Sequence, residues 1–156
     1  MPESVHEAVR GLRIVIGGLM GGLLAFAVLA SIVGPVSRSP DPDRARWILI
    51  AVALLCGGCA VRYAVLRRSL IRGLGARGTE LRQHSDPSGL IVEQYRGFVV
   101  AGGGLIEGPG FFAVVAYLVT GNRLALAAVG LALVMLAAHF PSTAALRRLA
   151  EAAARS

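Results

Sequence analysis

The residue best placed to do chemistry in this 156-residue sequence is a single carboxylate, Glu107, inside a long apolar run. No other Asp, Glu, Lys or Arg lies between Arg96 and Arg123. Removal from water disfavours the charged form of a carboxyl group, so we expect Glu107 to carry a proton near neutral pH. Pro109 has no N–H to donate to the carbonyl of Leu105, and the neighbouring glycines allow the helix to bend or unwind.

Glu107, Leu105 and Pro109 therefore form a candidate site for H⁺ or Na⁺, because an acid beside exposed carbonyls is typical of the broken-helix cation sites of transporters. The alternative is structural: a protonated Glu107 hydrogen-bonded to a neighbouring helix would hold helices together and bind no ion.

Two further motifs could carry chemistry. Cys56 and Cys59 form a C-x-x-C motif, which in a membrane bundle suggests a thiol–quinone oxidoreductase. The motif lies deep in an apolar run, where a thiolate is poorly solvated, and no second cysteine pair exists. His139 has no companion metal ligand. With no P-loop, zinc signature or nucleophile elbow, we expect no catalytic residue, no metal and no cofactor apart from H⁺ or Na⁺ at Glu107.

Glycines recur at four-residue spacing in two apolar runs, a pattern that lets membrane helices approach closely. These helix-packing candidates are Gly17, Gly18, Gly21, Gly22, Gly103, Gly104 and Gly108. The two runs match at an offset of 86 residues, with nine of the 18 positions from Gly17 to Gly34 identical. This match predicts a duplication, in which Gly21 of the first copy corresponds to Glu107 of the second.

The elements that must position these residues are membrane spans. The chain is 55% hydrophobic and 16% charged, and its charge-free runs reach the length of about 20 residues that crosses a bilayer. The sequence predicts an all-α integral membrane protein with four transmembrane helices in two repeated hairpins. The first predicted hairpin covers 1–66, with spans at 12–33 and 47–66, and the second covers 98–140, with spans at 98–120 and 124–140. Between them we expect a cytoplasmic loop and helix extension at 67–97, with helix resuming near Ser85–Pro87. An interfacial C-terminal helix is expected at 141–156.

All sixteen basic residues are arginine, and most flank the apolar runs. This placement favours lipid and topology roles over nucleic-acid binding. The candidates for anionic lipid headgroups are Arg62, Arg67, Arg68, Arg147 and Arg148. Twelve of the sixteen fall on one side if the N-terminus is inside, so we expect both termini in the cytoplasm, in a membrane of the bacterial inner (plasma) type.

Residues 95–120, from Tyr95-Arg96-Gly97-Phe98 through Gly103-Gly104-Leu105-Ile106-Glu107-Gly108 to Phe112-Ala113-Val114, resemble the acid-bearing helix of rotary-ATPase proteolipid (c-ring) subunits. In that family the carboxylate binds H⁺ or Na⁺, so the resemblance implies this role for Glu107. The long 67–97 connection, the acid on the third helix and Gly108-Pro109-Gly110 depart from the family pattern.

We expect a small non-enzymatic membrane subunit that packs through its glycine faces against copies of itself or other membrane subunits. The main alternative is a proton- or cation-translocating proteolipid-like protein that uses Glu107. The second alternative is the thiol–quinone oxidoreductase.

Overall fold

Prolines and polar caps set the ends of the helices. The computed structural model describes residues 3–36, 41–76, 87–146 and 148. Asp41 accepts a hydrogen bond from the Asp43 N–H at 3.1 Å, and Pro42, which has no N–H to leave unpaired, opens the helix behind it. The helices of the described residues are α1 (Glu3–Val33), α2 (Pro42–Ala76), α4 (Pro87–Thr120), α5 (Arg123–Ala138) and a short segment at 143–146.

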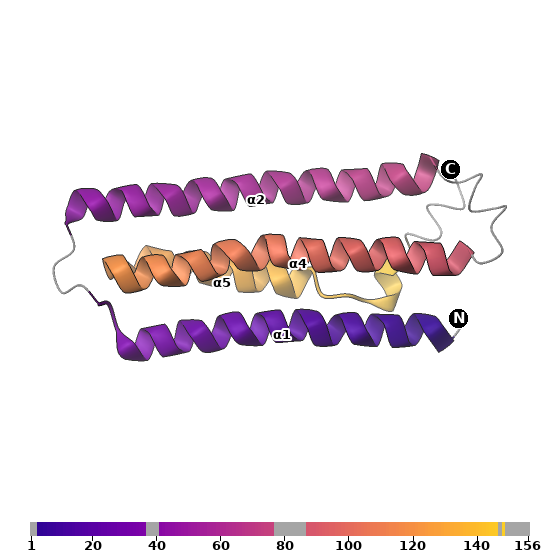
Figure 1. Ribbon diagram of the computed structural model, residues 1–156, viewed down its shortest axis with the longest axis horizontal. Helices are drawn as coiled ribbons and strands as arrows, with labels where there is room; N and C mark the ends of the chain where they lie inside the picture. Colours follow the sequence, from indigo (N-terminus) through magenta and orange to yellow (C-terminus); the bar gives the residue numbers. More distant parts are fainter. Residues whose placement is uncertain (1–2, 37–40, 77–86, 147, 149–156) are drawn as a thin grey trace.

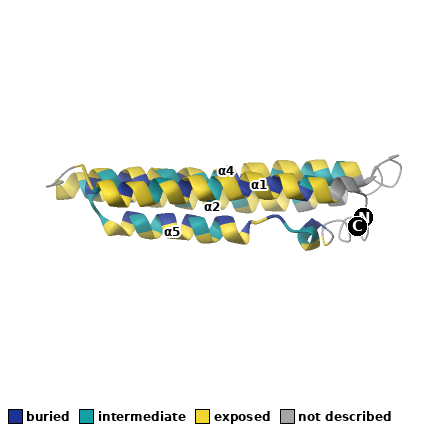
Figure 2. Cartoon of the chain, turned by 90° about the horizontal axis from the view of Figure 1, so that it is seen from below, coloured by how far each residue is buried: buried dark blue, intermediate teal, exposed yellow. Residues whose placement is uncertain are grey.

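The three long helices lie side by side in one layer, with α4 between α1 and α2 (Figure 1). The shorter helix α5 packs on one face of this layer, against α4 and α1 (Figure 2). Because α4 has α1 and α2 at its sides and α5 on one face, its exposed residues lie on the opposite side. We call that side the open face.

Three of the helices are long and apolar enough to cross a membrane: α1, α2 and α4. Large apolar side chains point outward along them, with Ile14, Leu54 and Ile32 between 70% and 77% exposed. A water-soluble chain of this size would bury most such side chains. These properties are those of an integral membrane protein.

The fourth apolar helix is shorter. α5 has 16 residues, about 24 Å, against the roughly 20 residues needed to cross a bilayer. It ends at Ala138 with His139 as the capping residue, and the chain passes through Pro141 before helix resumes at 143–146. Leu146 in this short helix is buried against Val9, Leu12 and Tyr95. The expected C-terminal helix at 141–156 is thus helical at 143–146 and 148, and its other residues from 147 onward lie outside the described residues.

The described residues of the predicted loop and helix extension at 67–97 are helical at 67–76 and 87–97, and residues 77–86 lie outside the described residues. α2 continues ten residues past the predicted end of its span at Leu66 and stops at Ala76. Leu66, Leu70 and Gly73 remain partly buried along this extension. The helix therefore continues through Gly73 and Gly75 in spite of a helix-propensity cost of about 1 kcal/mol per glycine, on which the sequence-based prediction of a loop depended. Helix resumes at Pro87, and α4 runs without interruption to Thr120.

Candidate functional site

Glu107 lies at the edge of the seam between α1 and α4. One turn before it, Gly103 lies against Ile16 and Leu19 of α1. One turn after it, the ring of Phe111 packs against Phe26 of α1, with 5.5 Å between ring centroids. Residues four apart share a helix face, so Glu107 also lies on the α1 side of α4. It is half-buried, and within the described part of the chain no hydrogen bond or ion pair reaches its carboxyl group.

The helix around Glu107 is not unwound. α4 stays helical through Pro109, which is buried, and Leu105 is partly buried. The missing N–H of Pro109 removes one bond to the Leu105 carbonyl, but the remaining helix bonds and the packing on both sides keep the segment regular. The unwinding that Pro109 and its neighbouring glycines would allow does not occur in α4. The candidate ion site of Glu107, Leu105 and Pro109 stays a prediction.

Close helix contacts inside the chain depend on only some of the glycines. A Cβ at Gly103 would lie 2.7 Å from Ile16 Cδ1, and one at Gly110 would lie 2.7 Å from Leu23 Cδ2. Gly102 is equally crowded, because a Cβ there would lie 2.8 Å from Nε2 of His139. At the other six glycines of the predicted packing set, a Cβ would meet no side chain or neighbouring helix within 4 Å among the described residues; they are Gly17, Gly18, Gly21, Gly22, Gly104 and Gly108.

Four of these open glycines lie on neighbouring stretches of α1 and α4. Gly18 and Gly22 are eight and four residues before Phe26, so they share its side of α1. Gly104 and Gly108 are seven and three residues before Phe111, so they share its side of α4. Phe26 and Phe111 are in contact, which makes the two stretches adjacent. We call these four residues the glycine face. Glu107 is next to it.

His139 forms a buried polar junction where α5 ends. Its Nε2 lies 3.1 Å from the carbonyl oxygen of Val99, and its Nδ1 lies 2.8 Å from the hydroxyl of Tyr63. A carbonyl can only accept, so Nε2 carries the proton and Nδ1 accepts from the Tyr63 hydroxyl. The imidazole also meets Tyr63 and Phe98 edge-on, with centroids 5.3 and 5.2 Å away. This junction ties α2, α4 and the end of α5 together.

Arg13 forms a hydrogen bond with the chain two residues after His139, at Pro141. Its Nε donates to the carbonyl oxygen of Pro141 at 3.2 Å. The carbonyls after a helix end have no intrahelical donor, and the Arg13 guanidinium supplies one. Arg13 precedes the first long apolar run in the sequence, and in the structure it also donates to a carbonyl 128 positions away in the sequence.

The remaining candidates are spread out. Cys56 and Cys59 are free, half-buried thiols in the middle of α2. The side chains of Arg62, Arg67 and Arg68 are exposed along α2 and Arg148 is also exposed, whereas Arg147 lies outside the described residues. Among the described residues no group of three or more His, Cys, Asp or Glu side chains could hold a metal ion.

The His139 junction was missed by sequence reasoning, although two signals point to it. His139 and Tyr63 each lie at the end of an otherwise apolar run. A buried tyrosine hydroxyl needs a partner, and few polar side chains are available in the spans to provide one. Gly102 gave no signal, because it is one of three consecutive glycines, Gly102 to Gly104, whose environments differ completely. Comparisons of the chain with protein-family models, with curated proteins and with solved structures find no match.

Proposed function

We propose that the protein is a non-enzymatic membrane subunit that assembles through its glycine face, with copies of itself or with other membrane subunits. The observation that carries this proposal is the division among the glycines. Gly103 and Gly110 serve contacts within the chain. The four residues of the glycine face have open space around them: Gly18, Gly22, Gly104 and Gly108.

The glycine face suits a helix partner better than lipid. Glycine lets backbones approach closely, and membrane helices associate through such packing and through interhelical hydrogen bonds. Glycine in the middle of a helix otherwise costs about 1 kcal/mol relative to alanine. A partner at this face would also lie beside Glu107 and could supply the hydrogen bond that no described residue gives to its carboxyl group.

The test is the mass of the detergent-solubilised protein and its Gly18→Leu and Gly104→Leu variants. Among the described residues, no side chain and no atom of another helix lies within 4 Å of a Cβ at either position, so we expect each leucine variant to keep the single chain folded. We expect both variants to lose the assembled species on native gels and in native mass spectrometry. Gly130→Leu is the matched control, because Gly130 in α5 is equally open but outside the glycine face. Wild-type mass in both test variants, or an equal loss in the control, would refute the proposal.

The second candidate function is proton or cation transfer at Glu107, as the resemblance to proteolipid subunits implies. It is favoured by one observation: the carboxyl group is half-buried next to the open face and has no partner among the described residues. A carboxyl group in this position is accessible to an ion or to a neighbouring subunit.

Carbodiimide labelling tests this second function, because the reagent attacks protonated carboxyls in apolar surroundings. We expect Glu107 to be labelled and the reaction to fall as pH rises, with a further fall in Na⁺ if the site takes that ion. Glu93, exposed on the same helix, is the control that stays unlabelled. The nearly isosteric Glu107→Gln substitution keeps the fold and abolishes ion-linked activity. An unlabelled Glu107 and a fully active Gln variant would leave only the structural role.

We further propose four spans in two repeated hairpins with both termini in the cytoplasm of a bacterial-type cell. The asymmetry of arginine along the sequence supports this orientation. Single cysteines at Ser4, Ser69 and Ser156, in a chain whose own cysteines are replaced by alanine, should react with a membrane-impermeant thiol reagent only after the cells are opened. Labelling of all three in intact cells would reverse the orientation.

A further inference from the structure

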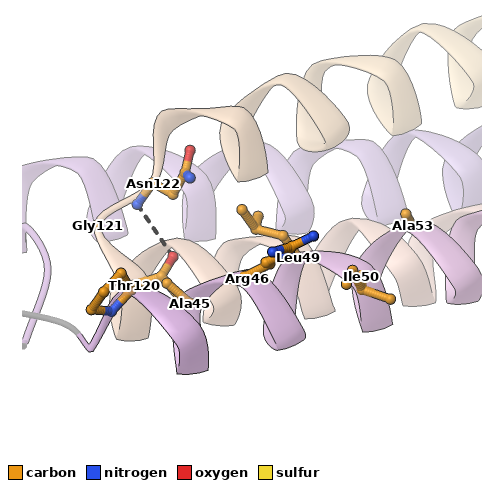
Figure 3. A pocket seen from close by; sticks show the side chains of 9 residues that line it. Ala45, Arg46, Leu49, Ile50, Ala53, Thr120, Gly121 and Asn122 are labelled. Carbon is orange, nitrogen blue, oxygen red and sulfur yellow. Dashed lines mark hydrogen bonds between the residues drawn. The ribbon is translucent and has the colours of Figure 1, made fainter.

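A groove lies at the end of the bundle where α2 begins. It has a volume of about 640 Å³ and is lined by the first turns of α2 and by the turn between α4 and α5 (Figure 3). The wall from α2 consists of Pro42, Ala45, Arg46, Leu49, Ile50 and Ala53. The other wall is the turn of Thr120, Gly121 and Asn122.

The groove follows from the way the helices pack. α2 and α5 both contact α4, but they meet each other through Tyr63 and His139, far from the start of α2. The space between them is therefore open at one end of the layer and closed at the other. The turn that forms the second wall is fixed: Thr120 donates to the carbonyl of Ala116 at 2.7 Å and accepts from the Asn122 N–H at 3.2 Å.

The groove combines one cation with an apolar floor. Arg46 is exposed, and no ion pair of Arg46 occurs in the part of the chain that the structure describes. The nearest acids in sequence are Asp41, just before α2, and Asp43 in its first turn, and Asp41 already accepts a hydrogen bond from the Asp43 N–H. Next to the guanidinium the lining is Leu49, Ile50 and Ala53.

The two parts of the groove lie at different membrane depths. Trp47 follows Arg46 and is 70% exposed, and tryptophan is enriched at the level of lipid headgroups. Ala53 lies about 10 Å further along the helix axis, within the acyl-chain region. The groove thus has a cation at headgroup depth and apolar residues deeper in the membrane. This order suits an anionic lipid, whose charged headgroup and acyl chain lie one below the other along the membrane normal. A small soluble anion would leave the apolar part unused.

We propose that this groove binds one anionic phospholipid, with the lipid phosphate on Arg46 and the first part of an acyl chain along Leu49, Ile50 and Ala53. Arginine suits the role because its guanidinium donates two parallel hydrogen bonds to a phosphate. The site is separate from the glycine face and from the arginines that the sequence suggested for lipid contact, and it does not depend on the proposed assembly.

The test uses the purified full-length protein in a non-ionic detergent, titrated with phosphatidylglycerol and followed by native mass spectrometry. We expect one phosphatidylglycerol retained per chain and weaker retention of phosphatidylcholine with the same acyl chains. Arg46→Gln should weaken phosphatidylglycerol binding roughly fivefold, the effect of one arginine at a membrane surface. Ala53→Phe, which keeps the charge but fills the groove, should weaken it by a similar factor.

Two matched controls decide specificity. Arg44 is exposed in the first turn of α2 and does not line the groove, so Arg44→Gln should bind as the wild type does. Ala51→Phe places the same ring on an exposed position outside the groove. Equal affinity of Arg46→Gln and Arg44→Gln, or of Ala53→Phe and Ala51→Phe, would overturn the proposal. Displacement of the lipid by millimolar inorganic phosphate would also overturn it, since that would show a site for a free anion.

Discussion

At Gly102 a single hydrogen atom makes room for the imidazole of His139. An added methyl group would lie 2.8 Å from Nε2 and 3.1 Å from the ring of Tyr63. Gly102→Ala should therefore displace the ring from both hydrogen-bond partners and destabilise the fold by about 1–3 kcal/mol, the usual cost of overpacking. Thermal unfolding in detergent, followed by circular dichroism, measures this as a lower melting temperature.

The matched control is Gly104→Ala, two residues further along the same helix. A Cβ at Gly104 meets no atom within 4 Å, and alanine is the better helix former. We expect a melting temperature equal to or above that of the wild type. Equal loss of stability in both variants would mean that the close contact at Gly102 is not what limits substitution.

The hydrogen bond between Tyr63 and His139 is testable by a double-mutant cycle. Tyr63→Phe removes the 2.8 Å bond and keeps the ring, and His139→Phe removes the imidazole partner. Removing one partner leaves a buried polar group unsatisfied, whereas removing both does not. The double variant should therefore be more stable than the sum of the single losses predicts, by about 1 kcal/mol. Additive losses would indicate that the two side chains are not coupled.

At the scale of the elements, the turn between α4 and α5 requires a left-handed backbone conformation at Gly121. Gly121 has φ +65°, and its N–H donates to the Tyr117 carbonyl at 2.8 Å, which ends α4. Asn122 then caps α5 by accepting the Leu124 N–H at 2.9 Å. Gly121→Ala should cost about 1–2 kcal/mol, because an L-residue is strained at this φ and its Cβ would meet Pro35 at 3.3 Å.

Gly130→Ala, in the open middle of α5, is the comparison for that turn variant. It should leave the melting temperature unchanged or raise it, since alanine favours helix at a position with free space. A stable Gly121→Ala protein would contradict the role given to the left-handed turn.

The starts of α2 at Pro42 and of α4 at Pro87 are encoded by local residues. In both, a proline follows an aspartate, and this pair favours the first turn of a helix. The end of α2 does not follow from local residues, because the helix continues to Ala76 through Gly73 and Gly75, which local propensity disfavours. α5 ends at Ala138, close to the predicted end of its span at residue 140 and just before Pro141, which cannot continue a helix. The sequence does not encode the hydrogen bonds of His139 to Tyr63 and Val99, which lie far away along the chain.

The same limit applies to the candidate site. Glu107 is visible in the sequence as a lone acid in an apolar run, but its place at the edge of the α1–α4 seam requires the contact of Phe26 with Phe111. The division of the glycines into crowded and open positions depends on which helices become neighbours. Sequence spacing marks Gly103 and Gly104 alike, and only the packing separates them.

At the scale of the whole molecule, the layer of three helices leaves α4, its central helix, uncovered on the open face (Figure 1). Two copies in the same orientation that meet through this face, related by a two-fold axis along the membrane normal, would bring α4 against α4. At a two-fold interface, a residue near the axis meets its own copy. Gly104, near the middle of α4, is then the position closest to its equivalent in the second copy.

A cysteine at Gly104 tests this arrangement in membranes. In a chain with Cys56 and Cys59 replaced by alanine, Gly104→Cys should form an intermolecular disulfide on mild oxidation, because a disulfide needs Cα atoms about 4.4–6.8 Å apart and glycine contacts bring helices that close. The product should be a dimer only, and Gly130→Cys should remain monomeric. If Gly104→Leu abolishes assembly while Gly104→Cys does not cross-link, the face instead contacts a different surface, as in a ring of head-to-tail copies or a complex with another subunit.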